Sequence, residues 1–101
     1  MSTSSPDDLA VAFRSLPRRL RQASTHDVAP EAITRATNEL QRSISAAASL
    51  MTCTANADNV ADAIQRRRTA EWTDDQLLQL QTCAQSAGRA LRDLEDLASS
   101  A

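Results

Sequence analysis

Apolar residues recur at helical spacing in four segments of the chain, and no segment shows the two-residue alternation of a β-strand. The first segment begins with Ser5 at the N-cap position, Pro6 at the first helical position and two acidic residues in the first turn, all of which suit a helix start. Its apolar face follows steps of four, three and four residues: Leu9, Phe13, Leu16 and Leu20. Pro17 interrupts this face, so we expect the helix to kink or break near Leu16.

The second and third segments predict a long helix over residues 30–51 and a shorter one over residues 58–70, separated by a turn at residues 52–57. The long helix starts at Pro30, after a polar loop at residues 24–29. Its inward face is expected to comprise Ile33, Ala36, Leu40, Ala47 and Leu50, widened by Ile44 and Met51. The shorter helix is expected to turn three residues inward: Val60, Ala61 and Ile64.

The fourth segment carries the clearest local signal in the chain. Thr73 and Gln76 have the spacing of a capping box, and Trp72 and Leu77 have the spacing of a hydrophobic staple. Leucine or alanine then recurs at the a and d positions of three heptads: Leu77, Leu80, Ala84, Ala87, Leu91, Leu94 and Ala98. Small residues on this helix, Gly88 among them, are expected to let another helix approach closely.

Together these segments predict an all-α protein, a small antiparallel bundle of three to four helices in which the second and fourth are long. We expect residues 1–5 to form a disordered N-terminal tail, residues 6–98 a single helical domain and residues 99–101 a C-terminal tail. Alanine supplies much of the 42% hydrophobic fraction, and Phe13 and Trp72 are the only aromatic residues. The core is therefore expected to be thin, which predicts either a marginally stable monomer or a fold whose stability a partner completes.

Residues suited to catalysis, metal binding or cofactor binding are sparse. The single histidine, His26, lies beside Asp27 in a polar loop, with no nucleophile tied to it by spacing. Cys53 and Cys83 lack the paired spacing of a metal site and are expected to be reduced structural thiols. We therefore expect no enzyme activity, no metal and no cofactor.

The charges are unevenly distributed, although the net charge is only −2 and gives no global attraction to nucleic acid or to an anionic membrane. Residues 9–24 carry four arginines and no acid, whereas residues 71–101 carry six acids, and these ends are expected to attract each other within one molecule or between two. The candidates for contacts with an anionic partner are six arginines: Arg14, Arg18, Arg21, Arg66, Arg67 and Arg68. For the run at residues 66–68, a solvated helix end is the favoured interpretation. All 11 basic residues are arginine, which codon bias in a GC-rich bacterial genome or selection against lysine modification explains.

A helix-turn-helix over residues 80–97, with Gly88 in the turn, is the strongest nucleic-acid interpretation of the sequence. Its second helix would present Asp93, Glu95 and Asp96 to the phosphates, so a continuous helix is favoured. We do not expect nucleic acid to be the partner. A small nucleic-acid-binding transcriptional regulator that uses the arginines of residues 66–68 and of the first helix remains the alternative function.

The long heptad seam exceeds what the shorter helices are expected to cover, which predicts a partner interface at Leu77, Leu80, Ala84, Ala87, Leu91 and Leu94. Leu78 and Leu97 extend apolar surface beyond the seam, and exposed apolar area normally marks an interface. The predicted function is a non-enzymatic protein-interaction module, an adaptor, regulator or inhibitor. It is expected to form a two-fold homodimer or to dock a helical protein partner.

No stretch approaches the roughly 20 apolar residues of a membrane span. Asp7 and Asp8 lie where a signal peptide carries positive charge, so we expect a cytoplasmic protein, with leaderless secretion left open. The length, the helical hairpins and a tryptophan in an inter-helix turn resemble the small secreted helical proteins of actinobacterial type VII systems. The Trp-x-Gly signature of that family is replaced by Trp72-Thr73-Asp74, so membership is not predicted.

Overall fold

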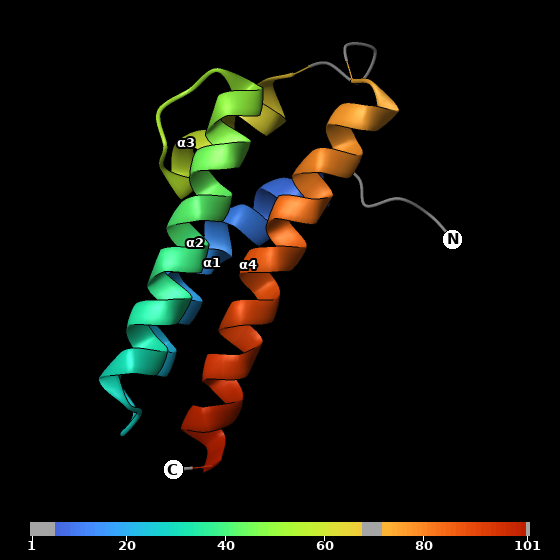
Figure 1. The fold of residues 1–101 in the computed structure, drawn as a ribbon. Coiled ribbons are helices and arrows are strands. Elements are labelled where there is room, and N and C mark those ends of the chain that lie inside the picture. Colours follow the sequence, from blue (N-terminus) through green and yellow to red (C-terminus); the bar gives the residue numbers. More distant parts are fainter. Residues whose placement is uncertain (1–5, 68–71, 101) are drawn as a thin grey trace.

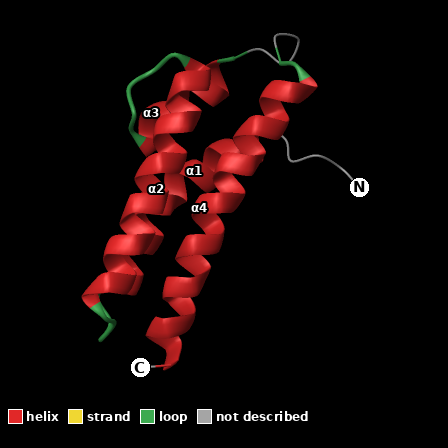
Figure 2. Ribbon diagram, in the orientation of Figure 1, coloured by secondary structure: helices red, strands yellow, loops and turns green. Residues whose placement is uncertain are grey.

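Helices make up 86% of the residues that the computed structural model describes, which are residues 6–67 and 72–100. The four helices are α1 (Pro6–Ser24), α2 (Pro30–Met51), α3 (Ala57–Arg66) and α4 (Asp74–Ser100). No strand occurs in these two ranges (Figure 2). The predicted all-α class, with long second and fourth helices, is therefore confirmed.

The long helices α2 and α4 lie side by side and run in opposite directions, with α1 and α3 behind them (Figure 1). α1 packs against both α3 and α4. The molecule measures 46 × 31 × 17 Å, and its short dimension corresponds to two layers of helices packed about 8–10 Å apart. One side of the α2–α4 pair is therefore covered by α1 and α3. No described helix covers the other side, which we call the open side (Figure 1).

α4 begins with the predicted capping box. The Thr73 hydroxyl accepts a hydrogen bond from the Gln76 backbone N–H at 3.2 Å, and the Gln76 side-chain oxygen accepts one from the Thr73 backbone N–H at 3.3 Å. Two backbone N–H groups at the start of the helix are satisfied in this way. Trp72 and Leu77, the predicted staple, are both partly buried against the core.

The core lies between the two layers, and all four helices contribute to it. Its largest fully buried side chains are Phe13 and Leu16 from α1, Val60 and Ile64 from α3, and Leu80, Leu91 and Leu94 from α4. α2 contributes smaller or less deeply buried side chains: Ala36, Leu40, Ile44, Ala47, Ala48 and Met51. The predicted inward faces of α1 and α3 are thus confirmed, with Leu20 only partly buried. On α2, Ile33 and Leu50 are likewise only partly buried.

Pro17 does not break α1, which continues as a single helix from Pro6 to Ser24. Of the expected kink or break near Leu16, the break is therefore wrong. The apolar face of α1 is packed into the core on both sides of the proline, with Phe13 and Leu16 buried before it and Ala23 buried after it. Tertiary packing has outweighed the local cost of the missing backbone donor.

Two helix ends differ from the sequence prediction. α3 ends at Arg66, with Arg67 in an extended conformation at φ −76° and ψ 129°, so its predicted continuation to residue 70 is wrong at Arg67, and residues 68–70 lie outside the described residues. α4 continues through Ser100, so residues 99 and 100, which the sequence places in a C-terminal tail, are helical. The predicted tail at residues 1–5, the Ser5 cap and Ala101 lie outside the described residues.

Candidate functional site

The heptad seam of α4 lies inside the chain's own core. Leu80, Ala87 and Leu91 are 0% exposed, and Leu94 is 2% exposed. The other two predicted interface residues, Leu77 and Ala84, are partly buried against the same core. The premise that the seam exceeds what the other helices can cover is therefore wrong, because α1 and α2 both pack along α4. Residues available to a partner must lie outside the seam.

α4 passes through Gly88 without a turn. The one positive φ among the described residues belongs to Thr52, at the C-terminal end of α2, so the helix-turn-helix interpretation of residues 80–97 is excluded. A Cβ atom added at Gly88 would meet nothing within 4 Å. The expected close approach of another helix at Gly88 is therefore not found.

Three large hydrophobic side chains are exposed among the described residues: Val11 at 63%, Leu78 at 60% and Leu97 at 51%. Leu78 and Leu97 lie near opposite ends of α4 and line two hollows on the open side of the α2–α4 pair. Val11 lies on α1 and lines neither hollow. The open side of the α2–α4 pair is thus where exposed apolar surface and concave shape coincide.

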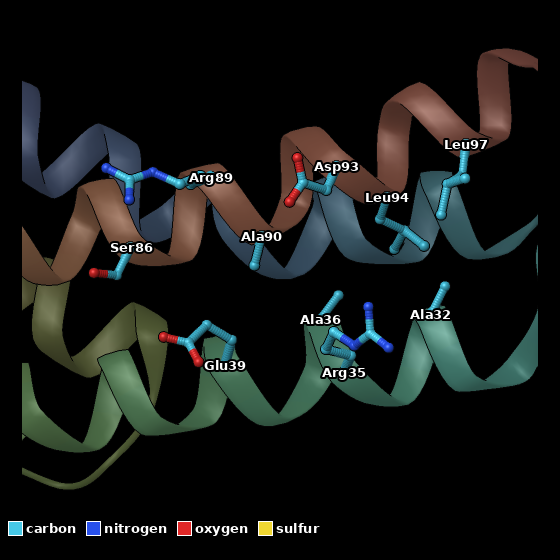
Figure 3. Close-up of a pocket in the computed structure, with 10 residues that line it drawn as sticks. All are labelled: Ala32, Arg35, Ala36, Glu39, Ser86, Arg89, Ala90, Asp93, Leu94 and Leu97. Atoms are coloured by element: carbon cyan, nitrogen blue, oxygen red, sulfur yellow. The ribbon is translucent and has the colours of Figure 1, made fainter.

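We call the first hollow the charged groove. It has a volume of about 290 Å³, and its lining comes from the N-terminal half of α2 and the C-terminal half of α4: Ala32, Arg35, Ala36, Glu39, Ser86, Arg89, Ala90, Asp93, Leu94 and Leu97. Figure 3 shows Arg35 at the level of Asp93 along the groove, and Glu39 at the level of Arg89. Each helix therefore carries one cation and one anion in this groove, and opposite charges stand level with each other across it.

The charges of the charged groove are largely unpaired among the described residues. Glu39 forms a long, exposed ion pair with Arg42, at 3.5 Å. Arg35, Arg89 and Asp93 form no ion pair with any described residue. Sequence reasoning missed this set, although both helices carry an arginine followed four residues later by an acid.

We call the second hollow the apolar groove. It has a volume of about 640 Å³ and lies between the C-terminal half of α2 and the start of α4, with the lining Ala46, Ser49, Leu50, Leu78, Gln79, Thr82 and Cys83. None of these side chains is charged at neutral pH. Burial raises the pKa of the Cys83 thiol, which keeps the sulfur protonated and a poor nucleophile. The pKa of the Cys53 thiol is raised for the same reason.

The arginines predicted to contact an anionic partner are not gathered into one unpaired patch. Arg14 donates to Asp62 at 2.8 Å and to Gln65 at 3.2 Å. Arg67 lies over the Trp72 ring, 5.1 Å from its centroid. The remaining described members of the set are exposed, namely Arg18, Arg21 and Arg66, while Arg68 lies outside the described residues.

Arg19 and Glu95 join α1 to α4, which realises within one molecule the predicted attraction between the basic and acidic ends. The pair is bidentate, with Nη2 to Oε1 at 2.7 Å and Nε to Oε2 at 3.1 Å. Hydrogen bonding from Arg19 lowers the pKa of Glu95 below its ordinary value of 4.5, against an opposing effect of burial.

His26 lies in the loop between α1 and α2 and lines a cavity of about 220 Å³ together with Glu95. Both carboxylate oxygens of Glu95 accept hydrogen bonds from Arg19, and neither cysteine lines this cavity. Among the described residues, no three histidine, cysteine or acidic side chains lie close enough together to hold a metal ion. Within the same ranges, no helix has the length and apolarity to cross a membrane.

No protein-family model, curated protein or solved structure matches this chain. The chemistry of its own surface is therefore what indicates a function.

Proposed function

We propose that the chain is a non-enzymatic protein-interaction module, acting as an adaptor, regulator or inhibitor, that binds a helical partner on the open side of α2 and α4. The partner is a second copy of the chain or a helical segment of another protein. The observation that carries the proposal is the exposure of Leu78 and Leu97, at 60% and 51%, at hollows on this one side.

The shape of this side suits a helix. α2 and α4 are antiparallel neighbours, and the two hollows between them form a groove. A further helix packs on such a groove at the ordinary spacing of about 8–10 Å between axes. Helix-in-groove recognition uses apolar anchors spaced along the groove, and Leu78, Leu50 and Leu97 provide them here. Covering these leucines removes apolar surface from water, which is the main driving force for such association.

The charged groove supports recognition of a protein rather than of a phosphate backbone. Arg35 and Arg89 are accompanied by Glu39 and Asp93, so the groove presents both signs of charge. A nucleic acid would meet repulsion from the two carboxylates. A protein helix that carries both signs can match them and gain selectivity for its partner.

The test compares two exposed apolar residues that differ in position. Leu78→Glu places a charge in the apolar groove, and Val11→Glu places the same charge on α1, outside both grooves. We expect the wild type and Val11→Glu to bind either a second copy, measured by light scattering, or members of a panel of amphipathic helical peptides, measured by fluorescence anisotropy. Leu78→Glu is expected to weaken that binding by at least about tenfold.

The proposal fails if neither self-association nor peptide binding occurs, or if the two variants behave alike. Binding of duplex DNA is measured by the same fluorescence anisotropy assay as binding of the peptides. A tight, sequence-selective complex, well beyond the roughly 10⁻⁴–10⁻⁶ M of non-specific contacts, would replace the proposal with the transcriptional-regulator alternative.

A further inference from the structure

We infer that the open side of α2 and α4 binds a second copy of the chain, related by a two-fold axis that runs along the groove between the two helices. This inference rests on the proposed function and names the partner. It depends on the order of charges and apolar residues along the groove.

The charged groove carries two cations and two anions, at two positions along its axis. We call a position along this axis a level. Arg35 on α2 is level with Asp93 on α4, and Glu39 on α2 is level with Arg89 on α4 (Figure 3). Ala36 and Leu94, each adjacent to one of these charges, share a small cluster of the core, which fixes the same alignment of the helices. The level of each charge is therefore set by α2–α4 packing.

A two-fold axis along the groove keeps every residue at its level and exchanges the two helices. α2 of one copy then lies over α4 of the other. Arg35 faces Asp93 of the second copy, Glu39 faces Arg89 of the second copy, and the symmetry repeats both pairs. Every charge of the charged groove thus meets an opposite charge.

The same axis places the apolar groove of one copy over the apolar groove of the other. Leu78 of each copy then lies at the level of Leu50 of the other copy, and no charged side chain lines this half. Burial of the apolar groove therefore leaves no ionised group without a partner. The free-energy cost of a buried, unpaired charge does not arise there.

The other two-fold arrangement, with the axis across the helices, inverts the levels. It would place Arg35, Asp93 and their neighbours over Leu78 and Leu50 of the second copy. Charges would then be covered by apolar side chains without partners, which is strongly unfavourable. The antiparallel charge attraction expected between the basic and acidic ends is also already used within one chain, by Arg19 and Glu95.

The order of the charged residues along α2 and α4 favours pairing between copies over pairing within one helix. In both helices the arginine precedes the acid by four residues, which is the less favourable order for a pair within one helix. Neither of these intrahelical pairs forms.

The axis along the groove also yields a four-helix arrangement in which all adjacent helices are antiparallel, as in ordinary four-helix bundles. The open side extends along α2 from Ala32 to Leu50, a length of about 28 Å, and the pair of helices is about 20 Å wide. The product of these two dimensions is the area that one copy can present to the other. The footprint of about 560 Å² is of the same order as the roughly 800 Å² of accessible surface that each partner buries in a stable interface.

Charge reversal tests this arrangement. Arg35→Glu and Asp93→Arg each place like charges at both symmetric contacts, so each variant alone is expected to be monomeric at concentrations where the wild type is dimeric. In a 1:1 mixture, Glu at position 35 faces Arg at position 93, and the native Asp93 faces the native Arg35. The mixture is therefore expected to form a heterodimer, which native mass spectrometry identifies by its mass.

The matched control is Arg18→Glu, which reverses an exposed arginine of α1 outside both grooves and is expected to leave the dimer intact. Mixing cannot repair a defect inside a single chain, so recovery in the mixture reports contacts between copies. Arg89→Glu and Glu39→Arg repeat the test at the contact between positions 39 and 89. They replace the first two variants if circular dichroism shows that either of those is unfolded.

Three results overturn the inference. If the wild type stays monomeric but binds helical peptides through Leu78, the dimer is rejected and the proposed function stands. A dimer that neither single variant weakens, or variants that stay monomeric when mixed, show that the charges do not meet across this axis.

Discussion

The ionisation of Glu95 is linked to the fold through its ion pair with Arg19. Its hydrogen bonds from Arg19 lower its pKa, so the ion pair stabilises the protein above the ordinary value of 4.5, and this contribution is lost as the pH falls through the lowered pKa. Both side chains are about a third exposed, at 33% for Arg19 and 39% for Glu95, which reduces the strength of the pair through solvent screening.

We expect Glu95→Gln to lower the free energy of unfolding by about 0.5–1 kcal/mol at pH 7, because the bidentate geometry is good but the pair is partly solvated. Urea denaturation at a series of pH values measures this difference, which should shrink as the pH falls below 4.5. Asp96→Asn, at an exposed neighbouring position on α4, is the control and should change stability little. A loss for Glu95→Gln that is independent of pH would show that the ion pair is not its cause.

Gly88 gives a second prediction at the scale of one residue. It lies inside α4, has no positive φ, and leaves open space where the Cβ atom of a larger residue would lie. Gly88→Ala should therefore raise the free energy of unfolding by up to about 1 kcal/mol, because alanine has the higher helix propensity. Urea denaturation measures this difference, and a clear destabilisation would mean that a Cβ atom is not accommodated at position 88.

At the scale of the helix, Pro17 is the residue in the interior of α1 whose intrinsic helix propensity is lowest. Replacing it with alanine adds a backbone N–H that can donate to the Phe13 carbonyl and removes the ring from that turn. The gain of up to about 3 kcal/mol is reduced by about 0.4–1 kcal/mol, because proline also restricts the unfolded chain.

We therefore expect Pro17→Ala to stabilise the protein by about 1–2 kcal/mol in thermal or urea unfolding, with Arg18→Ala at the next, exposed position as a nearly neutral control. A destabilised Pro17→Ala variant would indicate that packing of the partly buried proline ring outweighs the added hydrogen bond.

For the whole molecule, the distinction between core and interface is testable with two leucines of α4. Leu91 is 0% exposed, so Leu91→Glu should unfold the chain and abolish its helical circular dichroism at all concentrations. Leu78 is 60% exposed, so Leu78→Glu should keep the helical spectrum. Because association is linked to unfolding, the wild-type Tm should rise with protein concentration, and Leu78→Glu should remove that dependence. A wild-type Tm that does not change with concentration would contradict self-association.

The sequence by itself determined the four helices, their approximate ends and their inward faces, because these depend on local propensity, capping chemistry and the helical period. The Thr73–Gln76 capping box and the burial of Phe13, Val60 and Ile64 follow from residues a few positions apart. The break that the same local rules allow at Pro17 does not occur, because burial of the apolar face of α1 on either side of this residue outweighs its intrinsic preference.

Only the tertiary structure decided that the seam of α4 is covered by helices of the same chain. The helical period places Leu91 on the seam and Leu78 outside it, but it does not show whether the seam packs within the chain or against a partner. The level of Arg35 with Asp93 was also decided by tertiary structure, since these residues are brought together by the packing of α2 on α4 rather than by any short spacing in the chain. The candidate site is therefore a property of two helices together, because each contributes only half of its charges.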